Sequence, residues 1–417
     1  MRIDNQNKFN MYRFLLVYLR SIRNNPRMFL INISSFSIGI VAVMFMSLFV
    51  AKEFRADKFH RNHADIYRVL ENRTNAPERM SQTCFPMGNL LKSNHTEIRD
   101  FARYIELANY SIQVNKKQFV KQKISFVDAS FFKMFDFRLD AGDYTQIFQN
   151  PNTVIIDRET AIRYFGTTDV LGKTIEAEVG GQKGKTNLSI VGILSDYPEE
   201  STLKPQIIAD IKTREIKNAD NYFVSSPQLF LYIPNCTNIQ QLSGSLAKTF
   251  YSKLNELRTK KYAIDQNQLN LQRLDDLYLH SANVSDDLTK GDYTLLWILI
   301  CVGFILLTIT FINYIILNVG LSLKNQKQNQ INRILGGNSG WLRKKYITES
   351  VFYTTMAFFS ALLLLPIVHK IITGFSDYRY SLFSKSDQQI LLAFFTALIF
   401  LGILSGVIQY MVLEFRK

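Results

Sequence analysis

Cysteine is scarce in this sequence, with three copies in 417 residues. Cys84 and Cys236 fall in one long polar region, where they could pair in an oxidising compartment or remain two separate thiols. Cys301 lies in an uncharged apolar run and is most simply a small apolar side chain there. Three cysteines are too few for a scaffold held together by disulfides.

Sequence motifs of nucleotide binding and of common catalytic centres are also missing. The chain contains no G-x-x-x-x-G-K-[ST] run, so it does not bind ATP through a P-loop of its own. G-x-S-x-G, H-E-x-x-H and C-x-x-C are absent as well, and no set of Ser, His and Asp residues qualifies as a catalytic constellation. We therefore predict no catalytic residue, no cofactor and no metal site, and we expect that the chain is not an enzyme.

His60 and His63 have a spacing that fits neighbouring turns of a helix, which is a weak signal of metal binding. No cysteine lies nearby and no third ligand is evident. We interpret the pair as part of a polar helical stalk that continues the apolar run before it.

Long uncharged apolar runs are present instead, although the mean hydropathy of −0.02 resembles that of a soluble protein. Such runs occupy 28–51, 293–323, 350–368 and 390–413. Each reaches the ~20 residues that a bilayer requires, and a buried helix of a soluble protein rarely stays apolar on every face for so long. The first run is too long for a signal peptide and lacks a small-residue cleavage site. The sequence therefore predicts four transmembrane helices.

The net charge of +14 is concentrated beside these runs. Residues 1–27 contain six basic residues and one acid, and 324–346 contain six basic residues and no acid, whereas 52–292 contain 32 basic and 30 acidic residues. Because short basic loops stay in the cytoplasm, we predict both termini and 324–346 inside, with 52–292 and 369–389 outside. The basic residues flank membrane spans rather than cover one domain face, which argues against a nucleic-acid partner.

A basic amphipathic stretch precedes the first span. Apolar residues recur at helical spacing between Phe9 and Ile22, and basic residues occupy the other side. Such a helix lies in the headgroup plane with its basic face toward anionic membrane lipids. Pro26 disfavours helix in the residue before it, so the amphipathic helix is expected to end there.

The region 52–292 combines strand and helix patterns. Two hairpins are expected, one around a polar turn at 115–118 and one around a loop at 180–187. The other elements that the patterns predict are strands at 153–156 and 229–233 and helices at 158–165 and 239–257. The predicted fold class is therefore a polytopic α-helical membrane protein with a mixed α+β domain inserted between its first and second transmembrane helices.

Few ionisable residues interrupt the four apolar runs. Pumps and transporters that move ions usually place charged groups in the middle of the membrane. Asn313, in the second run, is interpreted as a group that hydrogen-bonds to a neighbouring helix. A pore for a hydrophilic solute is therefore disfavoured.

Short motifs follow one another along nearly the whole chain. They are DKFH at 57–60, IYRV at 66–69, SFFKMFDF at 130–137, AGD at 141–143, YFG at 164–166, LGKT at 171–174, VGIL at 191–194, DYP at 196–198, LYLHS at 277–281, NYI at 313–315, RILGG at 333–337 and ES at 349–350. Their order resembles that of the FtsX-like permeases of ABC transporters, the superfamily of the macrolide exporter MacB, the lipoprotein-release subunits LolC and LolE, and the division protein FtsX. That family also has one span, a large outer domain and three further spans.

The resemblance implies a mechanism in which no substrate crosses the bilayer. A separate ABC ATPase binds ATP and docks beneath the loop between the second and third spans, and two permeases, either identical copies or paralogues, form a dimer. The first and second helices carry the motion to a MacB-type periplasmic core domain. Work is then done on a lipid, lipoprotein or peptide outside the inner membrane, in some cases with a periplasmic adaptor or another envelope protein.

The resemblance also places an ATPase-coupling segment in this chain, formed by Lys327, Gln328, Arg333, Ile334, Leu335, Gly336 and Gly337. The family usually has Lys-Glu at the first two of these positions and a basic pair where this chain has Asn332 and Arg333. Loss of the acid and of one base weakens charge-assisted contacts with an ATPase groove. The chain is then the weaker-coupled member of an asymmetric pair, which we favour, or it no longer couples strongly to ATP. The two glycines also fit an ordinary helix C-cap.

Two other functions compete with the transporter hypothesis. An FtsX-like transmitter would use the same motion to activate a cell-wall hydrolase or another envelope partner, but the outer domain is large for that role. A membrane-anchored enzyme would carry its chemistry in the outer domain, but no residue pattern supports one.

The predicted layout can be stated segment by segment. It comprises a cytoplasmic amphipathic helix at 1–27, the first span at 28–51, a periplasmic α+β domain with stalk ends at 52–292, the second span at 293–323, the cytoplasmic coupling segment at 324–346, the third span at 347–368, a short periplasmic loop at 369–389, the fourth span at 390–413 and a cytoplasmic tail at 414–417.

Overall fold

The computed structural model describes residues 26–72, 78–150, 152–177, 185–198, 201–213, 220–257, 268–324, 339–374 and 385–414. The chain forms two compact units. The helical unit combines Met1–Lys52 with Thr294–Lys417, and the sheet unit is Glu53–Tyr293. The predicted amphipathic helix lies outside the described residues, as do residues 325–338 of the 324–346 segment and residues 375–384 of the 369–389 loop.

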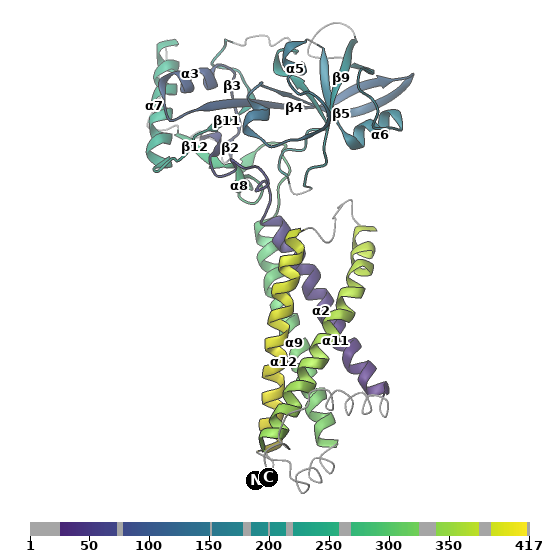
Figure 1. Ribbon diagram of the computed structural model, residues 1–417. Coiled ribbons are helices and arrows are strands. Elements are labelled where there is room, and N and C mark those ends of the chain that lie inside the picture. Colours follow the sequence, from purple (N-terminus) through teal and green to yellow (C-terminus); the bar gives the residue numbers. More distant parts are fainter. Residues whose placement is uncertain are drawn as a thin grey trace, which may run out of the picture. The chain divides into compact units, whose positions relative to one another are not determined.

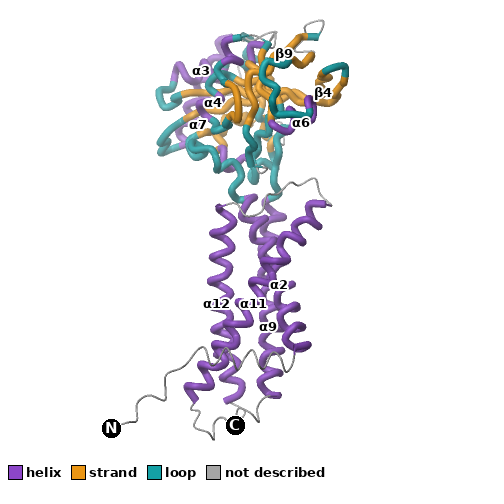
Figure 2. The backbone as a smooth tube through the Cα atoms, turned by 45° about the vertical axis from the view of Figure 1, so that its right-hand side comes forward, coloured by secondary structure: helices purple, strands orange, loops and turns teal. Residues whose placement is uncertain are grey.

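Four long helices make up the described part of the helical unit and run side by side in Figures 1 and 2. They are α2 (Pro26–Glu53), α9 (Tyr293–Lys324), α11 (Ser339–Gly374) and α12 (Lys385–Glu414). Each contains a stretch that is long and apolar enough to cross a membrane. The helix α11 extends beyond the predicted 347–368 at both ends and continues through Pro366.

Small residues let these helices approach one another closely. A Cβ atom on Gly39 of α2 would lie 2.3 Å from Thr310 Oγ1 of α9, and one on Gly406 of α12 would lie 2.5 Å from the Cα of Ile347 on α11. Asn313 Nδ2 donates a hydrogen bond of 3.0 Å to Ser35 Oγ on α2, so its predicted role between helices is confirmed. Close backbones and hydrogen bonds between helices are typical of association within lipid.

The sheet unit is organised around one mixed sheet, which contains 13 strands among the described residues. The main path of the sheet follows the order β13-β2-β1-β11-β4-β5-β10-β7-β9-β6, with β12, β3 and β8 paired beside it. The strands are β1 (Ile66–Asn72), β2 (Arg79–Met80), β3 (Gln82–Cys84), β4 (Asp100–Val114), β5 (Lys117–Val127), β6 (Leu139–Gly142), β7 (Thr153–Asp157), β8 (Thr174–Ala177), β9 (Thr186–Leu194), β10 (Ile207–Asp210), β11 (Ser225–Tyr232), β12 (Gln268–Arg273) and β13 (Val284–Ser285).

Short helices cover this sheet and complete its core. They are α3 (Met87–Asn94), α4 (Phe131–Met134), α5 (Gln146–Gln149), α6 (Arg158–Phe165), α7 (Ile239–Leu257) and α8 (Leu274–Leu277). Figure 1 shows α3 and α7 at one end of the sheet and α6 at the other. Three apolar clusters fill the interior, and the central one is rich in aromatic side chains that include Phe131, Phe135 and Phe137.

Both predicted hairpins are confirmed. In the β4–β5 pair Val114 lies opposite Lys117, so the turn consists of Asn115 and Lys116 alone. Their φ angles of 48° and 68° match a two-residue turn that follows the twist of the strands. The strands β8 and β9 pair antiparallel and form the second hairpin.

Two other local predictions are confirmed almost residue for residue. The strand β7 leads directly into α6, whose first turn is capped by Asp157 Oδ1 accepting the Thr160 N–H at 2.7 Å. Gly166 ends that helix with φ 73°, a conformation that suits glycine. The helix α7 has the predicted bounds, and β11 begins earlier than the predicted strand at 229–233.

The predicted helical stalk after the first span is wrong. The helix α2 ends at Glu53 and residues 54–65 form a series of turns, in which Asp57 has a φ of 58° that an α-helix cannot accommodate. At the other end α9 begins at Tyr293, and residues 286–292 are not helical. The three cysteines are free thiols, and Cys84 is buried.

Candidate functional site

The residues predicted to couple to an ATPase lie in 325–338, outside the described residues; they are Lys327, Gln328, Arg333, Ile334, Leu335, Gly336 and Gly337. The described residues bring together a different set, where the chain enters and leaves the sheet unit. We call residues 54–65, which follow α2, the outgoing tether, and residues 278–292, which precede α9, the incoming tether.

Asp57 fixes the first turn of the outgoing tether to a distant loop. Its carboxylate accepts the Thr202 backbone N–H at 2.8 Å, the Thr202 hydroxyl, and the Ser201 hydroxyl at 3.3 Å. The side chain is buried, and burial raises the pKa of Asp57 to about 6 despite these hydrogen bonds. A tight left-handed turn with a buried carboxylate therefore stands where the sequence predicted a solvated helix.

His60 is fully buried in an aromatic cage, so its interpretation as a polar stalk residue is wrong. Its ring lies 3.8 Å from that of Phe59 and within 5.4 Å of those of Phe135 and Phe137, measured between centroids. The Asp136 backbone N–H donates to Nδ1 at 2.9 Å, which places the imidazole proton on Nε2. Burial lowers the pKa of His60 to about 3, so the ring is neutral. Among the described residues no cluster of side chains could hold a metal ion.

Ion pairs extend the attachment of the outgoing tether. Arg61 donates from its backbone N–H and from Nε to the two carboxylate oxygens of Asp136, at 2.6 and 2.9 Å. His63 Nδ1 lies 3.3 Å from Asp275 Oδ2, just after the edge strand β12. The outgoing tether thus contacts three segments, near residues 136, 202 and 275, that lie far apart in the sequence.

Arg68 lies on β1, the strand that follows the outgoing tether, and connects it to the incoming tether. Its guanidinium donates to Asp286 at 2.5 Å, to Gln272 at 2.8 Å and to Ser281 at 3.1 Å. Arg68 and Asp286 are 0% and 1% exposed, so the pair is withdrawn from water. Burial lowers the pKa of Arg68, and the charge of Asp286 opposes that shift. Removing one partner of such a buried pair lowers the stability of the fold, because the other charge stays buried.

The incoming tether is locked at two further points before α9 begins. Lys290 Nζ lies 3.1 Å from Asp286 and donates to the Val284 carbonyl at 2.6 Å. The Gly291 N–H donates to the Tyr278 carbonyl at 2.8 Å, and a Cβ at this glycine would lie 2.4 Å from the Tyr278 ring. Only glycine allows this close approach.

Both tethers also pack on one apolar cluster. Phe59 from the outgoing tether and Leu288 from the incoming tether lie against the central cluster, which contains Ile66, Leu274 and Leu277. The two ends of the sheet unit are thus joined to each other and to its core. This arrangement suits mechanical transmission, because a displacement of either end must move the sheet as a body.

The sequence contains two weak signals of the ion pairs that Asp286 forms with Arg68 and Lys290. Arg68 is a full charge between Tyr67 and Val69, within the apolar run that begins β1, which indicates a buried ion pair or a functional group. Asp286 and Lys290 have helical i,i+4 spacing but lie in a loop. Neither observation predicts that Arg68 and Asp286 meet, because 218 positions separate them.

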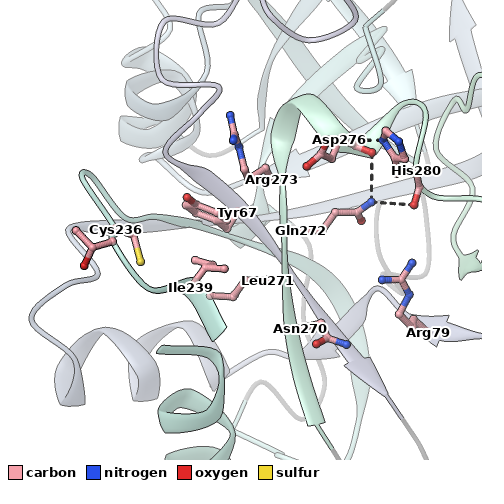
Figure 3. Close-up of a pocket in the computed structure, with 11 residues that line it drawn as sticks. Tyr67, Arg79, Cys236, Ile239, Asn270, Leu271, Gln272, Arg273, Asp276 and His280 are labelled. Carbon is pink, nitrogen blue, oxygen red and sulfur yellow. Dashed lines mark hydrogen bonds and ion pairs between the residues drawn. The ribbon is translucent and has the colours of Figure 1, made fainter. Parts of the chain in front are cut away.

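A cavity of about 540 Å³ opens beside this network, along the edge strand β12. Figure 3 shows Tyr67, Cys236, Ile239 and Leu271 on one side of the strand, with Gln272, Asp276 and His280 on the other. Asp276 lies 3.6 Å from His280 Nδ1, and Gln272 Nε2 donates to the backbone carbonyls of Asp276 and His280. The cavity is open and partly polar, and its lining residues do not form a catalytic arrangement.

The chain was compared with protein families and with known proteins. The family model described as the MacB-like periplasmic core domain matches residues 29–247. A comparison with curated protein sequences finds no match.

Solved structures of three domains are similar to about half of the chain. A domain from a Porphyromonas gingivalis protein described as a permease is 16% identical, with a TM-score of 0.42, covering 51% of this chain and 92% of its own. The periplasmic region of MacB from Actinobacillus actinomycetemcomitans is 15% identical, with a TM-score of 0.35 and coverage of 51% and 90%. The extracellular domain of the noncanonic ABC-type transporter YknZ from Gram-positive bacteria is 12% identical, with a TM-score of 0.36 and coverage of 49% and 98%.

Proposed function

Because the chain belongs to the family defined by the MacB-like periplasmic core domain, we propose that it is the permease subunit of an ABC transporter. A separate ATPase binds and hydrolyses ATP and docks on the cytoplasmic connection between α9 and α11. The helices α2 and α9 carry the resulting motion to the sheet unit. That unit then extracts or moves a lipid, lipoprotein or peptide outside the membrane.

The observation that carries this proposal is the joining of the two tethers. The sheet unit begins directly after α2 and ends directly before α9, and Arg68 with Asp286 ties the two ends together. A firm connection between the two ends suits a domain that is moved by two helices. The lack of a P-loop in the chain is consistent with ATP hydrolysis in a partner.

The same proposal includes the cellular setting. The four candidate membrane helices and their basic flanks support a multi-pass inner-membrane protein with both termini in the cytoplasm and the sheet unit in the periplasm. We propose that the permease works as a dimer with a second copy or a paralogue, in contact with membrane lipids and in some systems with a periplasmic adaptor.

Co-purification tests the ATPase partnership. The full-length chain, expressed with the ATPase encoded beside it, should retain that ATPase through detergent extraction and nanodisc reconstitution. Arg333→Glu should weaken the association, because it reverses the charge of the proposed docking segment. Lys116→Glu, the same charge reversal on the β4–β5 turn, serves as the matched control and should leave the association unchanged.

Two results would contradict the proposed function. One is failure of the wild-type chain to retain the ATPase in both detergent and nanodiscs. The other is a reversed topology, which can be tested with a cysteine introduced at the exposed Lys185. Labelling of that cysteine by an impermeant maleimide in intact spheroplasts is the expected result, and labelling only after lysis would overturn the mechanism.

A further inference from the structure

A single side chain of the helical unit meets all three of the other long helices. Tyr314 of α9 is 2% exposed, and its ring stacks on Phe36 of α2 with 4.4 Å between centroids. Its hydroxyl donates a hydrogen bond of 3.1 Å to the Ser350 carbonyl of α11 and lies beside the Ser405 side chain of α12. Tyr314 is therefore a point at which motion of one helix can reach the others.

Polar contacts continue on both sides of this tyrosine. Ser350 Oγ and Gln409 Oε1 form a hydrogen bond of 3.4 Å between α11 and α12. One turn further along α9, Asn318 Oδ1 accepts a hydrogen bond of 3.2 Å from Asn32 Nδ2 of α2. All four of these side chains are at most 5% exposed. The helical unit thus contains a buried polar network that crosses its four described helices.

The network has hydrogen-bonding capacity that this arrangement does not use. Asn32 Oδ1, Asn318 Nδ2 and Ser405 Oγ are buried and have no hydrogen-bond partner among the described residues. Two of these side chains, Asn318 and Ser405, lie beside the Tyr314 hydroxyl. Unpaired polar groups within hydrocarbon cost free energy. A second arrangement, in which the Tyr314 hydroxyl pairs with Ser405, would give one of these groups a partner.

The Ser350 carbonyl can tolerate the loss of the tyrosine. It also accepts a hydrogen bond of 3.1 Å from Thr354 Oγ1, one turn further along α11. When the Tyr314 hydroxyl moves from α11 to α12, the Ser350 carbonyl therefore keeps a hydrogen bond from Thr354. The aromatic stack on Phe36 does not depend on the direction of that hydroxyl.

We propose that Tyr314 is the positioning residue through which a displacement of α11 reaches α9 and α2. Its hydroxyl exchanges between the Ser350 carbonyl and the Ser405 side chain, while its ring keeps α2 and α9 in register. The role in transport rests on the proposed function, because α11 follows the connection where the ATPase is proposed to dock. The coupling between helices can be measured without any ATPase.

The first experiment measures that coupling in the full-length chain alone, in nanodiscs. Gly39→Ala adds a methyl group 2.3 Å from Thr310 at the α2–α9 contact, and Gly402→Ala adds one 2.6 Å from Thr354 at the α11–α12 contact. The melting temperature of the helical unit is followed by fluorescence of Trp297 and Trp341, the only tryptophans in the chain. If Gly39→Ala fails to fold, Thr310→Ala, which removes side-chain atoms from the same α2–α9 contact, replaces it.

The shifts of the two glycine variants should be non-additive in the wild-type background and additive in Tyr314→Phe, which keeps the ring and removes the hydroxyl. Thr308→Val removes a hydroxyl that bonds to the Phe304 carbonyl of its own helix, and it should preserve the non-additivity. Additive shifts in the wild type, or non-additive shifts that persist in Tyr314→Phe, would overturn the proposal. A general loss of stability does not by itself change additivity.

The second experiment connects the network with transport. The Tyr314→Phe permease should still co-purify with the ATPase but should lose most of the change in ATP hydrolysis that the wild-type permease causes. An unchanged response in this variant would contradict the role in transmission. Failure of the wild-type chain to bind the ATPase would contradict the proposed function instead, and the thermal experiment would still decide whether Tyr314 couples the helices.

Discussion

The two units bury their polar groups in different ways. In the sheet unit full charges are paired, fully withdrawn from water in Arg68 with Asp286 and partly in Arg103 with Asp128. In the helical unit several bonds between helices are made by neutral amides and hydroxyls, such as Asn32 with Asn318 and Asn313 with Ser35. Each unit thus contains a polar interior, but the kinds of group differ.

The difference determines how each unit responds to change. A buried ion pair that loses one partner leaves an uncompensated charge, at a cost of about 3–5 kcal/mol. Hydrogen bonds between neutral groups in membrane helices contribute roughly 0.6 kcal/mol on average, because the groups readily find other partners. The sheet unit is therefore built to keep its ends fixed, whereas the helical unit can exchange partners at low cost.

The largest expected effect tests the ion pair of the sheet unit. Arg68→Met should destabilise this unit by about 3 kcal/mol, the lower end of the cost of breaking a buried ion pair, since Asp286 stays buried and keeps Lys290 as an ionic partner. Hydrogen–deuterium exchange of β1 and β12 in the full-length chain measures the change. The double variant Arg68→Met with Asp286→Leu should recover most of the loss, because it removes both charges. Equal protection from exchange in the single and double variants would show that the buried charge of Asp286 does not cause the loss of stability.

The next effect concerns close packing in the helical unit. Gly406→Ala should lower the stability of the α11–α12 contact by about 1–3 kcal/mol, because its methyl would lie 2.5 Å from the Ile347 backbone. Tryptophan fluorescence during thermal unfolding reports the change. Gly320→Ala on α9 is the control, since a Cβ there has nothing within 4 Å. Similar melting temperatures for the two variants would show that close approach does not limit this unit.

A third prediction uses the opposite pH responses of two buried groups in the outgoing tether. Because burial raises the pKa of Asp57 from 3.8 to about 6, its contribution to stability is complete below 3.8 and is lost as pH rises through 6. Because burial lowers the pKa of His60 from 6.5 to about 3, its contribution is complete above 6.5 and is lost as pH falls toward 3. The two slopes oppose each other between about pH 4 and 6.

Asp57→Asn should therefore expose the response of His60. The sheet unit of this variant should lose up to ~1.4 kcal/mol per pH unit on acidification from about pH 6 to 4, while the wild type changes less. Urea titrations at several pH values, followed by circular dichroism, measure both slopes. Parallel profiles for variant and wild type would show that Asp57 does not offset His60.

The smallest effect is expected at the β4–β5 turn, far from the tethers in sequence. Lys116 has a φ of 68°, which a residue with a Cβ atom adopts at a cost. Lys116→Gly should stabilise the sheet unit by about 0.5–1 kcal/mol and produce the Asn-Gly pair that such turns favour. Lys117→Gly, within β5, should have the opposite sign in the same urea titration. A loss of stability in Lys116→Gly would show that strain at this turn is already relieved.

Much of the fold could be predicted because its signals are local. The β7–α6 unit depends on an N-cap at Asp157 and a glycine at 166, and both can be read within a dozen residues. The helix α7 repeats its apolar side chains at helical spacing, and the apolar runs of the helical unit need only length and composition. Local patterns of this kind do not require knowledge of distant partners.

The tethers could not be predicted in the same way. The charged residues after α2 resemble a solvated helix, yet Asp57 and His60 are buried by partners 145 and 76 positions away. Nothing near Asp57 in the sequence indicates that this residue will adopt a left-handed backbone conformation with its carboxylate buried. The resemblance to FtsX-like permeases directed attention to 325–338, which lies outside the described residues, whereas the described site is formed by tertiary contacts.

The joining of the two tethers has a consequence for how the sheet unit bears load. When two helices pull on opposite ends of a domain, the force normally peels its strands apart one hydrogen bond at a time. Here the ends are bridged by Arg68 and Asp286, and β1 pairs with β12 over six consecutive residues. Tension between the ends is therefore taken up by this bridge and by shear along β1 and β12, and the contacts of the outgoing tether near residues 136 and 202 share the load.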